Sequence, residues 1–171
     1  MNRLHNNVAI VTGGARGIGE GIVRRFVAEG AKVMITDVLD DLGQALADEL
    51  GDAAAFHHHD VTDRAQWATV IAATEAKFGK LTTLVNNAGV GITGPVEVQD
   101  MEATKLIFDT NVLGIQRMLH ALLPQMRAAK AGQIFNISSQ LGRVVIPGGG
   151  HYSATKFAVE GLSGSLALEV E

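Results

Sequence analysis

Tyr152 and Lys156 are the residues whose types and spacing most directly suggest chemistry. They lie four residues apart near the start of a helical pattern, so both side chains project from one face. The phenol of tyrosine has an ordinary pKa of about 10, and a lysine ammonium beside it favours the charged phenolate. The pair could therefore exchange a proton with a substrate near neutral pH. Taken alone, a tyrosine at a helix start is more often a packed surface residue.

Ser139 precedes this pair by thirteen residues and closes an apolar run typical of a strand. Ligands bind at the carboxyl ends of the strands in open α/β folds, and a hydroxyl there can donate a hydrogen bond to a substrate oxygen that gains charge. Ser138 is its neighbour, and side chains alternate along a strand, so only one of the two hydroxyls faces into the fold. Ser-Ser pairs also end strands in plain turns, so the residues alone leave the choice open.

A glycine-rich segment from Thr12 to Gly19 is a second chemical feature. It joins a strand-like run to a helical pattern. Glycines there let the backbone turn tightly and approach phosphate groups, and the helix start offers free N–H groups and the positive end of a dipole. Asp37 ends the next strand-like run, 24 residues after Gly13, where an acid can accept hydrogen bonds from ribose hydroxyls. The segment predicts a dinucleotide site, against the alternative of a helix-start turn with no ligand.

Asp37 and Arg16 bear on which dinucleotide is bound. A carboxylate at Asp37 would repel the 2′-phosphate of NADP, which favours NAD. Arg16, within the glycine-rich segment, could instead meet that phosphate. We expect a carboxylate in direct reach to outweigh an arginine that can turn into solvent. NAD is therefore the predicted cofactor, and NADP is the less favoured one.

Short β-branched runs alternate with longer helical patterns along the chain. The runs are nearly continuously apolar, which is typical of strands in parallel sheets. The pattern predicts strands at 8–11, 32–35, 54–57, from 84, and at 134–137. It predicts helices at 18–28, 40–50, 63–78 and 101–128, and another from about 151. We therefore expect the α/β class, a doubly wound parallel sheet (Rossmann fold), in one dinucleotide-binding domain over 1–171 that carries both cofactor and catalytic residues.

Composition excludes several classes of function. The net charge of −4 and the lack of a Lys or Arg run argue against a nucleic-acid-binding surface. The chain has no cysteine, which excludes disulfides and thiolate zinc sites. No stretch approaches the roughly 20 apolar residues of a membrane span, and the first residues lack the apolar core of a signal peptide. We expect a cytoplasmic protein that binds neither nucleic acid nor membrane.

Three consecutive histidines, His57 to His59, invite a metal-binding interpretation. Consecutive side chains of a strand point to opposite faces, so three in a row cannot converge on one ion. We therefore expect no metal site.

The long helix predicted at 101–128 is apolar on several sides, with Pro124 near its end as a candidate kink. A helix of this kind is covered on several sides. The pattern predicts a subunit interface, and we expect a homodimer or homotetramer formed through this helix and the last one.

Several segments, in this order and spacing, resemble motifs of the short-chain dehydrogenase/reductase family. The glycine-rich segment 12–19 resembles the family's T-G-x-x-x-G-x-G loop. Asp60-Val61 resembles its pair that contacts the adenine, and the run Asn86 to Gly89 is similar to its N-N-A-G turn. The segment Tyr152 to Lys156 resembles its catalytic Y-x-x-x-K. Within the family, the chain is most similar to NAD-dependent hydroxysteroid and secondary-alcohol dehydrogenases.

The resemblance implies roles for individual residues. Its catalytic residues would be Asn111, Ser139, Tyr152 and Lys156. It selects Ser139 over Ser138, gives Lys156 a second role on the cofactor ribose, and has Asn111 hold a water that links Lys156 to solvent. The alternative for Asn111 is a solvent-facing amide on a helix. The implied cofactor-binding residues are Gly13, Arg16, Gly17, Ile18, Gly19, Asp37, Asp60, Val61, Asn87, Ala88, Gly89, Tyr152 and Lys156.

The resemblance also implies an activity, hydride transfer between NAD(H) and the carbinol or carbonyl carbon of a secondary alcohol or ketone, with Tyr152 as general acid or base. The family continues with a sixth strand and a substrate loop. We therefore expect a chain truncated after its fifth strand and the following helix, with that strand an exposed edge. The alternative is a truncated, non-catalytic nucleotide-binding or interaction module. Gly148 to Gly150 would be either a flexible lip of the substrate cleft or loop slack.

Overall fold

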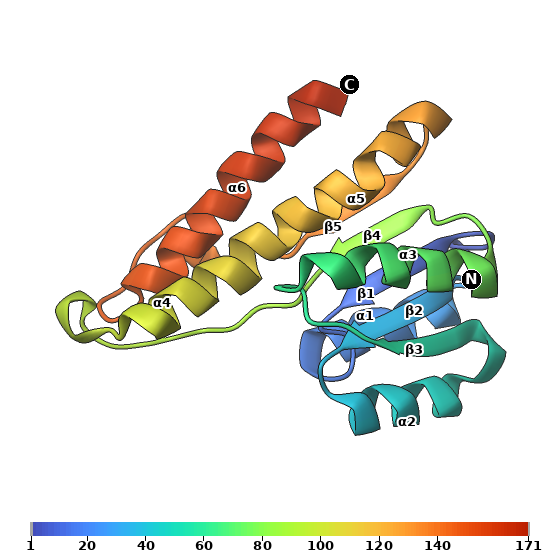
Figure 1. Cartoon of the computed structure of the whole chain (residues 1–171), viewed down its shortest axis with the longest axis horizontal. Helices are drawn as coiled ribbons and strands as arrows, with labels where there is room; N and C mark the ends of the chain where they lie inside the picture. Colours follow the sequence, from blue (N-terminus) through green and yellow to red (C-terminus); the bar gives the residue numbers. More distant parts are fainter. Residues whose placement is uncertain (1, 171) are drawn as a thin grey trace.

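Five parallel strands form one sheet through the middle of the molecule (Figure 1). In the computed structural model, which describes residues 2–170, they stand in the order β3-β2-β1-β4-β5, and every neighbouring pair is parallel. Residues 1 and 171, the ends of the expected domain, lie outside the described residues. The strands are β1 (Val8–Thr12), β2 (Lys32–Asp37), β3 (Ala54–His58), β4 (Thr83–Asn86) and β5 (Gln133–Asn136). The strand order reverses between β1 and β4, which opens a crevice at their carboxyl ends and confirms the doubly wound α/β expectation.

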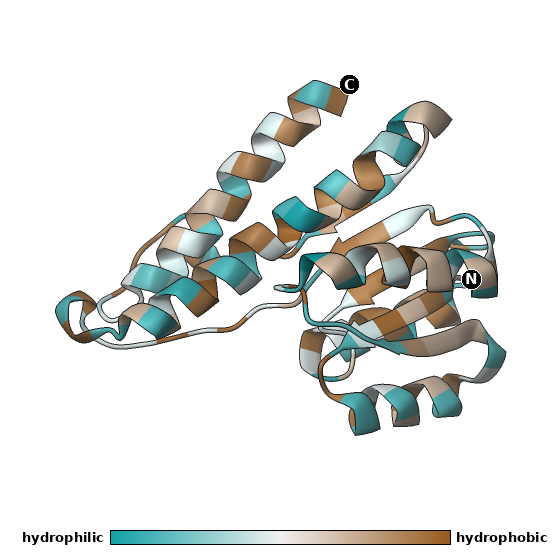
Figure 2. Cartoon of the chain, in the orientation of Figure 1, coloured by the Kyte–Doolittle hydropathy of each residue, from teal (hydrophilic) through white to brown (hydrophobic). Residues whose placement is uncertain are grey.

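Helices cover both faces of this sheet. On one face, α3 and α5 pack on the strands around Ile10 and Trp67; on the other, α1 and α2 pack around Val11 and Val23. Figure 2 shows hydrophobic residues along the central strands and hydrophilic ones on the outer turns of α2. The helices are α1 (Gly17–Ala28), α2 (Asp40–Leu50), α3 (Arg64–Phe78), α4 (Met101–Phe108), α5 (Gly114–Ala129) and α6 (Gly150–Val170).

The apolar strand runs form because they are buried on both sides. All five residues of β1 are buried, and so are five of the six in β2. Alternate side chains enter the two helical layers, so neither face of a central strand can be polar. Local signals then set the helix bounds. Asp63 caps α3 by accepting from Ala65 N at 2.8 Å, and Gly79, with φ of +90°, ends it.

The long helix predicted at 101–128 is interrupted. A π-helical turn at Asp109–Leu113, called the π-turn below, separates α4 from α5. The apolar positions Ile107 and Ile115 stay on the buried side across it, so the sequence pattern reads as one continuous helix. Pro124, the predicted kink, lies within α5, which continues to Ala129. The break therefore comes from the π-turn.

Strand β5 is the open edge of the sheet. It spans one residue less at its C-terminal end than predicted and pairs, within residues 2–170, with β4 alone. Its residues alternate between exposed and half-buried, and Phe135 is 46% exposed. The expected exposed edge is therefore present. Helix α6 begins at Gly150 and packs on α5 through a small cluster that includes Ile115 and Val159.

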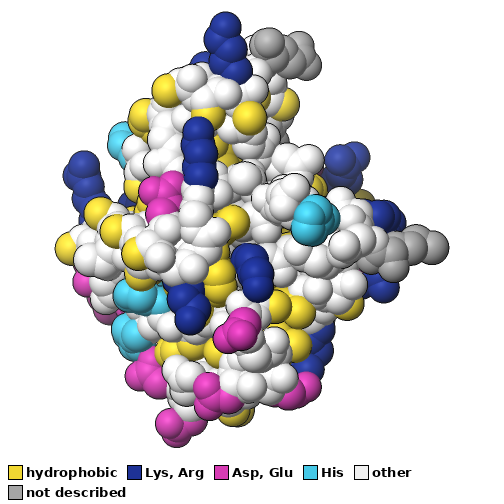
Figure 3. Space-filling model, turned by 90° about the vertical axis from the view of Figure 1, so that its right-hand side faces the viewer, with side chains coloured by type: hydrophobic (Ala, Val, Ile, Leu, Met, Phe, Trp, Pro, Cys, Tyr) yellow, Lys and Arg dark blue, Asp and Glu magenta, His cyan; other side chains and the backbone are white. Residues whose placement is uncertain are grey.

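The surface carries mixed charge on the side shown in Figure 3. Lys and Arg side chains are scattered among acidic and apolar ones and form no single basic patch there. Within residues 2–170, no helix combines the length and apolar character that a bilayer crossing requires.

Candidate active site

A cleft of about 760 Å³ lies at the carboxyl ends of the strands. Its walls come from the segments that follow each of the five strands, from α4 and the π-turn, and from the start of α6. Asn111 and Ser139 are not part of its lining, whereas Ser138 is. Every residue assigned to the cofactor by resemblance lines it, namely Gly13, Arg16, Gly17, Ile18, Gly19, Asp37, Asp60, Val61, Asn87, Ala88, Gly89, Tyr152 and Lys156.

The glycine-rich loop is folded tightly against itself and against the turn after β4. Gly13 and Gly17 both have φ of +60°, a conformation that favours glycine. A Cβ at Gly13 would lie 2.8 Å from Ala88 Cα, and one at Gly19 would lie 2.0 Å from Gly13 O. Neither position has room for a side chain. The loop thus presents the start of α1 to the cleft as an anion-binding helix end.

Thr12 and Asn87 join this loop to the turn after β4. Thr12 Oγ1 accepts hydrogen bonds from Asn87 N and Ala88 N, both at 3.0 Å. Asn87 Nδ2 donates in return to Thr12 O and Gly13 O, both at 2.9 Å. The floor of the cleft is therefore fixed from both sides before any ligand arrives.

Asp37 presents its carboxylate at the β2 side of the cleft. Its Oδ2 accepts from Ala15 N at 3.1 Å, and its Oδ1 accepts from Val38 N and Leu39 N at 2.8 and 3.2 Å. A carboxylate oxygen has two lone pairs, so Oδ1 is fully used and Oδ2 keeps one acceptor position for a ribose hydroxyl. Three backbone N–H groups hold this negative charge in place.

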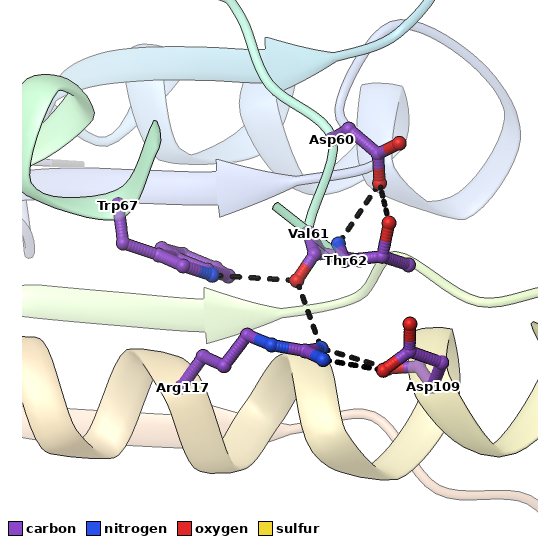
Figure 4. A network of polar contacts seen from close by, with 6 residues as sticks. All are labelled: Asp60, Val61, Thr62, Trp67, Asp109 and Arg117. Carbon is purple, nitrogen blue, oxygen red and sulfur yellow. Dashed lines mark hydrogen bonds and ion pairs between the residues drawn. The ribbon is translucent and has the colours of Figure 1, made fainter. Parts of the chain in front are cut away.

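The turn after β3 carries Asp60 and Val61 into the cleft. Asp60 Oδ1 accepts from Thr62 N and Thr62 Oγ1, both at 2.8 Å, which orients the other carboxylate oxygen (Figure 4). The neighbouring histidines diverge. His58 Nδ1 contacts Asp40 Oδ1 at 2.7 Å, whereas His59 is buried with its ring 4.0 Å from that of Trp67. No group of three His, Cys, Asp or Glu side chains in residues 2–170 is placed to hold a metal ion.

Tyr152 and Lys156 extend from the first turns of α6. Lys156 Nζ lies 5.6 Å from the centroid of the Tyr152 ring and donates to Ile137 O at 2.8 Å. Burial lowers the pKa of Lys156 below its ordinary value, because desolvation penalises the ammonium. Gly91 lies beside the same ring, since a Cβ there would be 3.8 Å from Tyr152 Cδ2, an ordinary van der Waals contact.

The two serines after β5 have different surroundings. Ser139 Oγ accepts from Leu141 N at 3.1 Å and begins a short 3₁₀ turn, Gln140–Gly142. Since the oxygen is the acceptor there, its hydroxyl proton remains available for donation. Ser138 Oγ is buried and has no hydrogen-bond partner within the described part of the chain.

Asn111 is buried inside the π-turn, so the alternative of a solvent-facing amide is wrong. Its Oδ1 accepts from Val90 N at 2.9 Å. Its Nδ2 donates to Val90 O at 2.9 Å and to Thr155 Oγ1 at 3.2 Å. The side chain thereby ties the segment after β4 to α6, one residue before Lys156.

Comparison with known proteins decides the family. The model described as short chain dehydrogenase matches residues 7–171. The chain belongs to the short-chain dehydrogenase family.

The relatives are dehydrogenases of varied specificity. The chain is 45% identical to 3-alpha-(or 20-beta)-hydroxysteroid dehydrogenase of Mycobacterium tuberculosis, over 98% of this chain and 65% of that protein. It is 40% identical to the NADP-dependent (R)-specific alcohol dehydrogenase of Lentilactobacillus kefiri and 39% identical to 2,5-dichloro-2,5-cyclohexadiene-1,4-diol dehydrogenase LinX of Sphingobium indicum, over 98% of this chain and 68% of each. The chain therefore spans about two thirds of the length of these relatives.

Three contributors to this short-chain dehydrogenase site were not predicted from the sequence. The π-turn gives no sign in the apolar periodicity. Thr155 occupies an unspecified position of the Y-x-x-x-K motif, yet its hydroxyl accepts a hydrogen bond from Asn111 and so positions that side chain. Thr12 was predicted only to begin the glycine loop, and its hydrogen bonds to Asn87 and Ala88 were not foreseen. A hydroxyl at the end of an otherwise apolar strand could have indicated a buried hydrogen bond.

Proposed function

We propose that this protein is an oxidoreductase that transfers hydride between NAD(H) and the carbinol or carbonyl carbon of a secondary alcohol or ketone. The main support is the single cleft in which the glycine-rich loop meets Tyr152 and Lys156. A nicotinamide dinucleotide fits the residues present. The cradle at Gly13 and Gly19 has no room for a side chain, and Asp37 keeps an acceptor position for a hydroxyl. When bound, the dinucleotide would supply the hydride acceptor or donor.

Tyr152 is the general acid or base of this proposal. In oxidation its phenolate takes the hydroxyl proton of the substrate, and in reduction its phenol returns one. The Lys156 ammonium, 5.6 Å from the ring, favours the phenolate by its charge. The hydrogen bond from Lys156 to Ile137 O uses one N–H and holds the amine beside the phenol. Two donors then remain for a cofactor ribose or a water.

Ser139 and Asn111 support this proton transfer in different ways. Ser139 is next in sequence to Ser138 of the cleft lining; its Oγ accepts from Leu141 N, so in this proposal its proton is donated to a substrate oxygen that reaches beyond that lining. The side chain of Asn111 is already bonded to Val90 and Thr155. Asn111 therefore acts in this proposal by fixing the backbone around Lys156, and a linking water would be held by other atoms of the π-turn.

NAD is the cofactor we propose, because the Asp37 carboxylate is held in the cleft by three backbone N–H groups. Replacing Asp37 by Ala should shift the ratio of kcat/KM for NAD over NADP toward NADP by about 10-fold or more, as one charge-assisted hydrogen bond and a repulsion are removed. An unchanged ratio would mean that Asp37 does not select the cofactor. The NADP-dependent alcohol dehydrogenase among the relatives makes this measurement informative.

Tyr152→Phe tests the activity itself. The variant keeps the aromatic ring and removes the phenolic hydroxyl that exchanges the proton. Turnover of a panel of secondary alcohols should therefore fall by about 10²- to 10⁴-fold while the Kd for NAD is unchanged. Phe157→Leu, on the same helix but outside the cleft lining, is the matched control. Retained turnover in Tyr152→Phe would contradict the assignment. An unsubstituted protein that binds NAD but turns over no alcohol would favour a non-catalytic nucleotide-binding module.

We also infer that a second copy of the chain packs on the outer face of α5 and α6. A groove between these helices is lined by five apolar side chains and five polar or charged ones; the apolar residues are Leu119, Leu123, Pro124, Leu162 and Leu166. Light scattering in solution should give a dimer or tetramer, and Leu166→Glu should dissociate it. A monomeric unsubstituted protein would contradict this interface.

A further inference from the structure

Side chains from two helices hold the turn after β3 (Figure 4). Trp67 of α3 donates its Nε1–H to Val61 O at 3.3 Å, and Arg117 of α5 donates from Nη1 to the same oxygen at 3.5 Å. Val61 O and Thr62 N belong to one peptide plane, and Thr62 N donates to Asp60 Oδ1. Because a peptide group is planar, holding its carbonyl also orients the N–H that fixes the Asp60 carboxylate.

The same arginine holds the π-turn. Arg117 Nη1 donates to Asp109 O at 3.3 Å, and Nη2 donates to Asp109 Oδ1. Asp109 is the first residue of the π-turn, and Asn111 follows two residues later with its side chain bonded to Val90. A guanidinium is a planar fork of donors, so this one group contacts both turns at once.

The start of α5 also lies close to the side chain of Val61 in the turn after β3. Gly114 follows the π-turn, and a Cβ there would lie 3.1 Å from Val61 Cγ2 and 3.2 Å from Val61 Cβ. A side chain at this position would press on Val61, so glycine lets the start of α5 lie close to this turn. The side chain of Arg117 is 21% exposed and that of Asp109 is 35% exposed, so this ion pair is more sheltered than an ordinary surface pair.

We propose that Arg117 is a positioning residue that couples the turn carrying Asp60 to the π-turn that carries Asn111. An adenine nucleotide that binds at Asp60 and Val61 thereby fixes the π-turn. The inference rests on the proposed function, because it takes an adenine nucleotide as the ligand of this end of the cleft. The role requires arginine. A lysine keeps a positive charge beside Asp109 but cannot reach Val61 O and both Asp109 oxygens in one planar arrangement.

Binding of AMP, measured by calorimetry, is the first readout. Arg117→Lys and Arg117→Met should both bind AMP about 3- to 10-fold more weakly than the unsubstituted protein. Arg127→Met is the matched control, since Arg127 is also on α5 but its guanidinium contacts Glu169 O on α6, away from the cleft. The control should bind AMP normally. Asp109→Asn keeps the side-chain shape and removes the charge, and it replaces Arg117→Met should that variant not fold.

Hydrogen–deuterium exchange of the amides at 109–113 is the second readout. With AMP adjusted to equal occupancy in every variant, AMP should slow this exchange in the unsubstituted protein and have no such effect in Arg117→Lys. Thr62→Ala removes one donor to Asp60 without touching the π-turn. It should weaken AMP binding and keep the protection, which separates coupling from mere loss of affinity.

Three outcomes would overturn the inference or its basis. If Arg117→Lys bound AMP normally and kept the full AMP-induced protection of the amides at 109–113, Arg117 would not couple the turn carrying Asp60 to the π-turn. If Thr62→Ala and Arg117→Lys lost the AMP-induced protection of the amides at 109–113 equally, the turn carrying Asp60 would account for the protection without Arg117. An unsubstituted protein that binds neither AMP nor NAD would instead refute the proposed function, independently of Arg117.

Discussion

The cofactor side of the cleft and its catalytic side are packed differently. On the cofactor side, β1 and β2 are buried between helices of both faces, and Thr12 and Asn87 bind the glycine loop to the next turn. On the catalytic side, β5 is an open edge, and the buried residues of α6 lie only between Ser153 and Val159. A groove of about 1000 Å³ runs along β5, α5 and the outer part of α6.

This difference in packing determines whether a substitution changes cofactor affinity and the free energy of unfolding together or separately. Substitutions at the buried positions of the cofactor loop, such as Gly14 and Gly19, are also substitutions in the core, so cofactor affinity and the free energy of unfolding should change together. Tyr152 and Lys156 stand at the inner end of a helix whose outer half carries little packing. Changes in that outer half should therefore leave cofactor affinity almost unaltered, even where they change the free energy of unfolding.

Acid should weaken the cofactor side through His59. Burial, with the positive charge of His57 adding to it, lowers the pKa of His59 from 6.5 to about 4. Below pH 6.5 the unfolded chain binds a proton that the native protein does not take up until about pH 4. Stability from this group is therefore complete above pH 6.5 and is lost as the pH falls to 4, by about 3 kcal/mol.

Urea unfolding at pH 7 and pH 4 measures this loss. His59→Leu should remove most of the pH dependence in that window, because the buried ring that must stay neutral is gone. His58→Gln is the control, since the ring of His58 is half exposed and faces Asp40. A pH dependence that is the same in His59→Leu and in the unsubstituted protein would contradict the role given to burial.

Gly19→Ala tests whether cofactor affinity and stability fall together. The new Cβ would lie 2.0 Å from Gly13 O, and backbone cannot yield as a flexible side chain would. We expect a cost of about 1–3 kcal/mol in unfolding free energy and a fall in NAD affinity of about 10- to 100-fold. Gly21→Ala lies two residues on in α1, where a Cβ meets nothing within 4 Å, and should change neither quantity adversely. Lost affinity at full stability would show that the loop is independent of the core.

Gly148→Ala and Gly161→Ala sharpen the comparison on the catalytic side. Gly148 has φ of +76°, and its carbonyl accepts from Gly94 N at 2.9 Å, which ties together the segments after β4 and before α6. Alanine there should cost about 1–2 kcal/mol and raise KM for bulky alcohols more than for small ones. Gly161 is on α6 with open space around it, so alanine should stabilise the protein by about 0.5–1 kcal/mol. Thermal unfolding and alcohol kinetics measure both, and equal effects at the two sites would contradict the contrast.

The sequence predicted the sheet and the cleft well because these depend on short-range signals. Apolar runs mark buried parallel strands, and glycines with an acid at the end of the next strand mark the nucleotide loop. The π-turn escaped prediction, since Ile107 and Ile115 keep helical periodicity across it. The glycines at 148–150, left open between a flexible lip and loop slack, are closely packed. A Cβ at Gly149 would lie 2.8 Å from Ile146, and one at Gly150 would lie 2.9 Å from Val96. The contact of Gly150 with Val96 joins segments more than 50 residues apart, and contacts of that kind leave no mark on the local sequence pattern.

The π-turn also fixes how many residues must separate α4 from α5. An α-helix advances about 100° per residue. Deleting Val112 or Leu113 would therefore either close the π-turn into an ordinary α-helical turn or turn α5 by about that angle relative to α4. With α5 turned, Asn111 could still face Val90, or Arg117 could still face Val61, but both could not. Deleting Val112 or Leu113 would therefore be more damaging than most substitutions, although it would leave every charged and polar side chain of the site in the sequence.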